Sequence, residues 1–103
     1  MTDVINIVKQ YVTKLSSSGV DIYKAYLFGS YARNEATELS DIDVLIVSEA
    51  YNIFNLEKKA KAWAITAGID SRIEPHTIGT EKYFSTGSII LNEALKEGIE
   101  IKI

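Results

Sequence analysis

Apolar residues recur along the chain with two different periods, and the longer period predicts three helices. Residues 2–18 carry apolar side chains at i, i+3, i+4 and i+7 spacing, which is typical of an amphipathic helix, and Gly19 can cap its C-terminus. Residues 53–66 and 88–97 repeat this spacing, and the last helix should end at Gly98. The inward faces should be formed by Val4, Ile5, Val8, Tyr11, Val12 and Leu15 in the first helix, by Ile53, Leu56, Ala60, Trp63 and Ala64 in the second, and by Ile89, Ile90, Leu91, Ala94 and Leu95 in the third, with Thr86 or Ser88 as its N-terminal cap.

Runs of aromatic and β-branched residues predict the strands between these helices. Residues 22–28 and 41–47 form two such runs, of which the second is the more strongly apolar. Residues 69–78 read as a third strand, in which Pro75 indicates a sheet edge or a bulge. Residues 99–103 alternate as a terminal strand or an extended tail. This order of elements predicts the α/β (α+β) class, with a small mixed sheet backed by helices.

Composition narrows the range of functions. The chain of 103 residues, 47% of them apolar, fits a single domain over residues 1–103. Its net charge of −3 provides no basic surface for bulk nucleic-acid binding. The absence of cysteine excludes disulfides and thiolate metal sites, and a single histidine excludes a zinc site made of several histidines. Since neither a signal peptide nor a membrane-spanning run is visible, we expect a cytoplasmic protein without membrane association.

Two aspartates stand at the start of the most apolar strand. Asp41 and Asp43 alternate with Ile42 and Val44, so both carboxylates should project from one face of the sheet. Carboxylates placed so close repel each other unless a cation lies between them. In a chain with one histidine and no cysteine, an all-oxygen site suits Mg²⁺ or Mn²⁺.

A third acidic ligand is expected from a neighbouring strand. Alternation in the segment "SRIEPH" places Arg72, Glu74 and His76 on one face, and Glu74 is the preferred candidate. Asp70 shares that parity and competes with it, although its position at the start of the strand suits a cap. His76 is interpreted as a polar residue of an edge strand or as a contact to the acceptor.

Groups that can bind phosphate are expected where the first strand ends. Gly29 allows close approach of the backbone to a ligand, and Ser30 adds a hydroxyl and a backbone N–H. Arg33 and Ser40 are further candidates for nucleotide binding. The alternatives are ordinary ones: pairing of Arg33 with nearby glutamates, and a capping role for Ser40.

These residues resemble a known signature. Gly29-Ser30, ten further residues and then Asp41-Ile42-Asp43 resemble the GSx10DxD pattern of the minimal nucleotidyltransferases, a branch of the DNA polymerase β superfamily. The segment "RIEPH" is similar to the part of that family that carries the third carboxylate. The chain departs from the family at Asn34, where glycine is common, but asparagine tolerates left-handed backbone conformations.

The resemblance implies a polymerase β-like fold and a two-metal mechanism. Asp41 and Asp43 would bind two Mg²⁺ ions, Glu74 would complete the catalytic ion, and Gly29 and Ser30 would hold the triphosphate of ATP or another NTP. Small members of the family act as antitoxins beside a HEPN-domain toxin, and some transfer AMP from ATP to a tyrosine of that toxin. The resemblance therefore implies a hetero-oligomer with a HEPN partner, with a homodimer as the alternative for the isolated chain.

Two other functions compete with this interpretation. The chain could neutralise its partner by binding alone, with a vestigial nucleotide site, or it could transfer a nucleotide to a small molecule or an RNA end. All five site residues are present, which argues against a vestigial nucleotide site, since a protein that only binds its partner does not need clustered acids. The absence of an acceptor domain and of a basic surface argues against the small-molecule and RNA acceptors.

Overall fold

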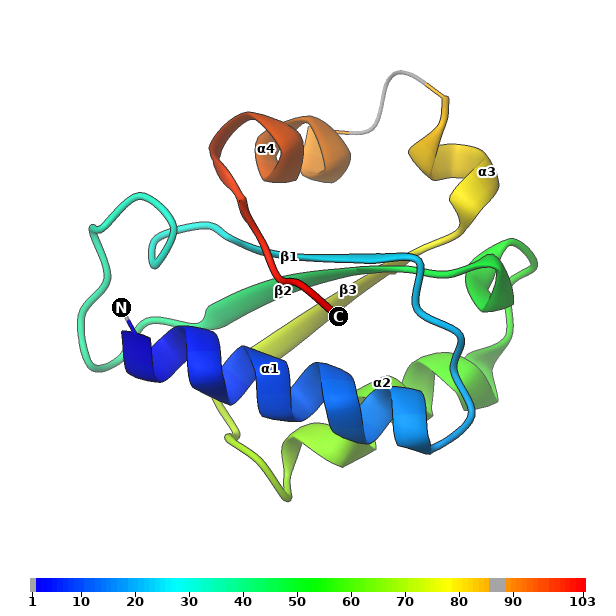
Figure 1. The fold of residues 1–103 in the computed structure, drawn as a ribbon, viewed down its shortest axis with the longest axis horizontal. Coiled ribbons are helices and arrows are strands. Elements are labelled where there is room, and N and C mark those ends of the chain that lie inside the picture. Colours follow the sequence, from blue (N-terminus) through cyan, green and yellow to red (C-terminus); the bar gives the residue numbers. More distant parts are fainter. Residues whose placement is uncertain (1, 86–88) are drawn as a thin grey trace.

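The computed structural model describes residues 2–85 and 89–103 (Figure 1). Four strands form one sheet, and helices cover both of its faces. In chain order the elements are α1 (Thr2–Ser17), β1 (Lys24–Phe28), β2 (Ile42–Val47), the 3₁₀ helix η1 (Glu49–Tyr51), α2 (Leu56–Thr66), β3 (Ile73–Ile78), α3 (Thr80–Tyr83), α4 (Ile89–Glu97) and β4 (Ile99–Glu100).

The sheet has the strand order β3-β2-β1-β4 and is mixed. Strand β1 pairs antiparallel with β2 on one side and with β4 on the other, whereas β2 and β3 run parallel. The predicted class, a small mixed sheet backed by helices, is confirmed. Pro75 lies in the edge strand β3, as predicted, where a residue without an N–H group is tolerated.

The alternating side chains of β2 contribute to two apolar layers. Ile42, Val44 and Ile46 pack with α1 and α2 on one face of the sheet. Leu45 and Val47 pack on the other face, where α3 and α4 lie (Figure 1). Asp43 and Leu45 are two residues apart in β2, so the Asp43 side chain points to the same face as Leu45, the face covered by α3 and α4.

The second helix is shorter than predicted and turns a different face inward. It begins after Asn55, whose Oδ1 accepts a hydrogen bond from the Lys58 N–H at 3.0 Å. Ala62 and Thr66 are its buried residues. The small side chain of Ala62 allows close approach of α1, and the buried hydroxyl of Tyr11 donates to the Ala62 carbonyl at 2.7 Å. The predicted inward face was wrong, since its members are exposed: Ile53, Leu56, Ala60, Trp63 and Ala64.

Predictions for the last helix were partly right. Leu91 and Ala94 are buried as expected, but Leu95 is 51% exposed. Thr86 and Ser88, the predicted caps, lie outside the described residues, as do the side chains of Ile89 and Ile90. Within the described part of the chain, no helix combines the length and apolar character needed to cross a membrane.

Candidate active site

The predicted site residues come from three segments that meet at one end of the sheet. Antiparallel pairing sets Phe28, the last residue of β1, opposite Asp43 near the start of β2. Parallel pairing sets Asp43 opposite Glu74 near the start of β3. Gly29 follows Phe28 directly, so the glycine-serine pair and the carboxylates share this end. The register between the strands thus produces the convergence that the sequence could only suggest.

Gly29 lies directly against the Asp43 carboxylate. Its φ angle is +75°, in the left-handed region that favours glycine, and a Cβ atom at this position would collide with Asp43 Oδ2. The chain then makes a turn, in which the Arg33 N–H donates to the Gly29 carbonyl at 3.1 Å. The prediction that Asn34 keeps this turn in a left-handed conformation is confirmed by its φ of +59°.

Glu74 lies among the other carboxylates. Burial raises the pKa of its carboxyl group, and a hydrogen bond with Asp41 and the negative charge of Asp43 raise that pKa further. A cation bound between these carboxylates would offset their repulsion and favour the ionised form of Glu74. The side chains of Asp41, Asp43 and Glu74 are each partly or fully exposed, so this acidic cluster is open to solvent. The donor set therefore fits a divalent ion.

His76 joins the cluster, a position that sequence reasoning left undecided. Its Nε2 lies 3.3 Å from Asp43 Oδ1 and 3.8 Å from Glu74 Oε1. Possible ligand atoms of the three residues all lie within 4.8 Å of one another. The sequence indicated that His76 shares a strand face with Glu74, two residues earlier. A shared face alone does not say whether the His76 side chain reaches the neighbouring strand.

Asp70, the alternative candidate for the third carboxylate, is hydrogen-bonded to Arg72. Its two carboxylate oxygens accept hydrogen bonds from Arg72 Nε at 3.0 Å and Nη2 at 2.8 Å, and Oδ1 also accepts from the Arg72 N–H. Arg72 in turn donates to the Tyr31 hydroxyl at 3.0 Å. These bonds hold the turn before β3, which explains why the strand begins at Ile73 and not at residue 69. The geometry favours Glu74 as the third carboxylate.

Asp70→Asn should destabilise the protein at neutral pH by about 1 kcal/mol, because it removes a charge-assisted pair. The hydrogen bond from Arg72 holds the pKa of Asp70 below its usual range. The pair's contribution is therefore present above the usual aspartate pKa and is lost as pH falls through the depressed one. Urea melts of both proteins at a series of pH values should converge in strong acid. A constant difference at every pH would contradict this prediction.

Glu74→Gln should stabilise the metal-free protein at pH 7. The raised pKa means that the folded state binds its proton more tightly than the unfolded state, so folding stability falls as pH rises above the usual glutamate range. The side chain is 39% exposed, so solvent screening should limit the gain to less than about 1 kcal/mol. Melts in EDTA and in MgCl₂ test this: the variant should melt higher in EDTA, and only the wild type should gain from Mg²⁺. A variant that melts lower in EDTA would refute the prediction.

The remaining predicted residues, Arg33 and Ser40, have partners in the loop and in α4. Arg33 pairs with Glu35 and with Glu97 of α4, each at 3.2 Å. The first of these pairs is one of the alternatives raised from the sequence. Ser40 accepts a hydrogen bond from the Thr37 N–H at 2.9 Å, which closes a turn within the loop. In this structure both side chains act on the loop that joins Gly29 to Asp41.

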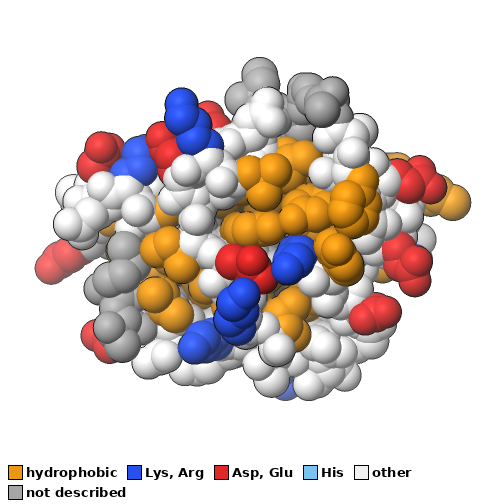
Figure 2. Space-filling view, turned by 45° about the horizontal axis from the view of Figure 1, so that its top comes forward, with side chains coloured by type: hydrophobic (Ala, Val, Ile, Leu, Met, Phe, Trp, Pro, Cys, Tyr) orange, Lys and Arg blue, Asp and Glu red, His pale blue; other side chains and the backbone are white. Residues whose placement is uncertain are grey.

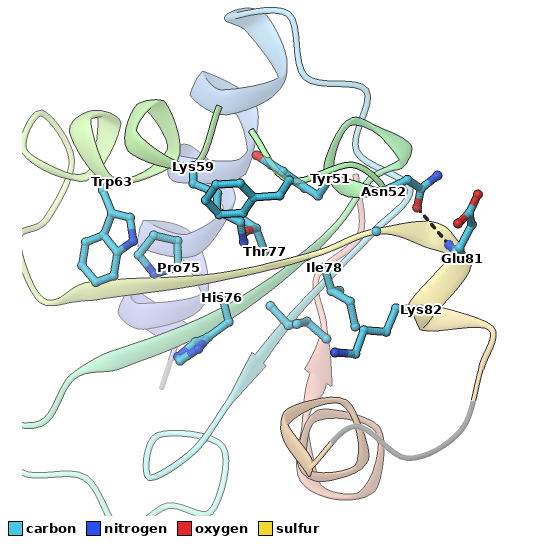
Figure 3. Close-up of a pocket in the computed structure, with 13 residues that line it drawn as sticks. Tyr51, Asn52, Lys59, Trp63, Pro75, His76, Thr77, Ile78, Glu81 and Lys82 are labelled. Carbon is cyan, nitrogen blue, oxygen red and sulfur yellow. Dashed lines mark hydrogen bonds between the residues drawn. The ribbon is translucent and has the colours of Figure 1, made fainter. Parts of the chain in front are cut away.

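A hollow of about 580 Å³ extends from His76 along the edge of the sheet (Figure 3). Figure 3 shows His76 on one side of β3 and Pro75 and Thr77 on the other, towards Lys59 and Trp63. Lys59 Nζ donates to Thr77 Oγ1 at 2.9 Å, which ties α2 to β3. The exposure of Trp63, 51% of its surface, is explained by its place in the wall of this hollow.

Comparison with known proteins agrees with this geometry. A protein of Methanocaldococcus jannaschii named as a protein adenylyltransferase, MJ0604, is 51% identical over 43 residues. That match covers 41% of the chain and 43% of the relative, so the chain is matched to less than half of that relative's length.

Solved structures share the fold. A protein of Sulfolobus solfataricus named as a nucleotidyltransferase superposes with a TM-score of 0.67 at 19% identity, over 96% of this chain and 79% of the other. A toxin-antitoxin crystallised with AMP-PNP gives a TM-score of 0.66 at 17% identity, over 90% and 71%. The family model of the nucleotidyltransferase domain matches residues 5–99. The chain thus belongs to the nucleotidyltransferase domain family, as the sequence signature indicated.

Proposed function

We propose that this chain is a metal-dependent nucleotidyltransferase that transfers AMP from ATP to a tyrosine hydroxyl of a HEPN-domain toxin, and that it is the antitoxin of that pair. One observation carries the proposal: Gly29, Asp43 and Glu74 come from three segments and meet at one end of the sheet, and Asp41, directly before β2, is near enough to raise the pKa of Glu74. The adenylyl group and the protein acceptor are suggested by the relative MJ0604. The toxin partner is suggested by the toxin-antitoxin among the similar folds.

In this proposal the carboxylates hold the metal. Asp41, Asp43 and Glu74 would bind Mg²⁺, as two ions, with Mn²⁺ as a substitute. Bound there, the ions would neutralise the triphosphate and lower the pKa of the attacking hydroxyl. The contribution of the chain is to keep three acids together at a sheet end, where burial first and the neighbouring acids second raise the pKa of Glu74.

Gly29 and Ser30 would contact the triphosphate. The backbone can approach a ligand closely at Gly29 because no side chain intervenes. Arg33 would reach a phosphate only by leaving Glu35 or Glu97, and both ion pairs are exposed enough to break at little cost. Ser40 would act through the loop, whose shape its bond to Thr37 maintains.

The transfer itself is a displacement at the α-phosphorus. The acceptor oxygen forms a bond to this phosphorus while the bond to the bridging oxygen of the β-phosphate breaks, and pyrophosphate leaves. The proton of the acceptor hydroxyl passes to a carboxylate of the cluster.

A labelling experiment tests the proposal. The chain is incubated with MgCl₂, a purified HEPN-domain protein and ATP labelled at either the α- or the γ-phosphate. Label from the α-position should appear on the partner, and mass spectrometry should locate one AMP on a tyrosine. Absence of α-label, or label from the γ-position, would refute AMP transfer.

A second function is favoured by an exposed apolar surface. Figure 2 shows hydrophobic side chains gathered beside a small group of charged ones. Tyr23 and Phe84 are 49% and 68% exposed, and their rings contact each other edge to face at 5.6 Å. Such a surface suits protein binding, so the chain could neutralise its partner by occlusion. In that case an Asp41→Asn/Asp43→Asn variant would protect cells from the toxin as well as the wild type does.

A further inference from the structure

The chain contains one histidine, and the fold places it in the acidic cluster. His76 follows Glu74 by two residues on β3, so both side chains project from the same face. Its Nε2 lies 3.3 Å from Asp43 Oδ1 on the neighbouring strand and 3.8 Å from Glu74 Oε1. Two carboxylates and one imidazole nitrogen therefore converge on one point.

The imidazole ring is held in this orientation by its surroundings. Phe28, which pairs with Asp43 across β1 and β2, contacts the ring edge to face at 5.1 Å between centroids. Leu45, the register partner of His76, is buried on the same face. The His76 side chain is 23% exposed, so one part of it faces solvent while Nε2 faces the carboxylates. A ring packed in this way retains its direction without a ligand.

The spacing of the donor atoms suits a shared ion. Ligand atoms bonded to one cation at about 2.1 Å lie roughly 3 Å apart when they are neighbours in its coordination sphere. The separations of 3.3 Å and 3.8 Å between Nε2 and the two carboxylates are close to that spacing.

We propose that His76 is a nitrogen ligand of the metal site, together with Asp43 and Glu74. Imidazole is a better ligand for Mn²⁺, Co²⁺ or Zn²⁺ than for Mg²⁺, which prefers oxygen. The site is therefore more selective for transition metals than the all-oxygen site inferred from the sequence. This inference rests on the metal site of the proposed function, but it requires neither ATP nor an acceptor.

The lone histidine makes a direct test possible. Pulsed EPR of Mn²⁺ bound to the untagged chain should show coupling to an imidazole nitrogen, which no residue other than His76 can supply. His76→Gln should abolish this coupling while retaining a side chain that can donate to Asp43. In calorimetric titrations the same variant should bind Co²⁺ at least about 10-fold more weakly, with a smaller loss for Mg²⁺.

Thr77→Ser is the matched control. Thr77 is the next residue of β3, it points to the opposite side of the strand from His76 (Figure 3), and serine keeps the hydroxyl that accepts from Lys59. This variant should retain the nitrogen coupling and both affinities. Mn²⁺ binding without nitrogen coupling, or equal Co²⁺ affinity in wild type and His76→Gln, would overturn the role of His76 and leave the proposed function standing. Failure of the wild type to bind any of these ions would overturn both.

Discussion

Asp43→Asn is expected to lower AMP transfer about 10³-fold while leaving the fold intact. The carboxylate lies at the centre of the site: Glu74 pairs with Asp43 across the sheet, His76 contacts its Oδ1, and Gly29 packs against its Oδ2. Asparagine keeps the shape but removes one negative charge from the metal site. Loss of a ligand charge that stabilises the transition state by about 4 kcal/mol corresponds to this factor.

The measurement compares initial rates of α-label transfer at saturating ATP, with circular dichroism to confirm folding. Asp21→Asn is the matched control, because Asp21 is an exposed aspartate before β1, at the opposite end of that strand from the site. This control should transfer label at the wild-type rate. If Asp43→Asn also did so, the acidic cluster would have no catalytic role, and the binding function would be the better interpretation.

The polar residues of the site were predictable because each belongs to a strong local pattern. Alternation at the start of β2 and β3 gave the direction of Asp43 and Glu74, and the glycine-serine pair marked the end of β1. The packing of α2 was not predictable in the same way. Its apolar positions fit a helical stripe, but Trp63 faces a hollow at the sheet edge and Ala62 faces α1. Periodicity shows that a helix has an apolar face without showing which neighbour will cover it.

The place of His76 also depended on information that a single sequence lacks. Its distance to Asp43 is set by the parallel register of β2 and β3, a contact between residues 33 positions apart in the chain. The sequence offered one histidine and therefore argued for oxygen ligands alone. Because the register brings that single histidine to the carboxylates, the composition argument excluded a zinc site of several histidines but not a mixed site.

Gly29→Ala should lower both the stability of the protein and its rate of AMP transfer, the first through backbone strain and the second through displacement of Asp43. Alanine is strained at a φ of +75°, at a cost of about 1–2 kcal/mol. In a domain near 100 residues this lowers Tm by about 5–15 °C. The new Cβ would also collide with Asp43 Oδ2 and displace the carboxylate from the site. Since misplacing a catalytic group by about 1 Å can cost 10²-fold, transfer should fall by about that factor even in the folded fraction.

Gly19→Ala separates the two effects. Gly19 also has a positive φ, +110°, but a Cβ there would meet no atom within 4 Å, and the residue lies after α1, far along the chain from the acidic cluster. Both variants should therefore lose stability in thermal melts, whereas only Gly29→Ala should lose transfer and Mn²⁺ affinity per folded molecule. If the two variants lost transfer equally, the contact between Gly29 and Asp43 would have no part in the site. If Gly29→Ala retained full Mn²⁺ affinity, the displaced carboxylate would not be a ligand, and the assignment of Asp43 would fall with it.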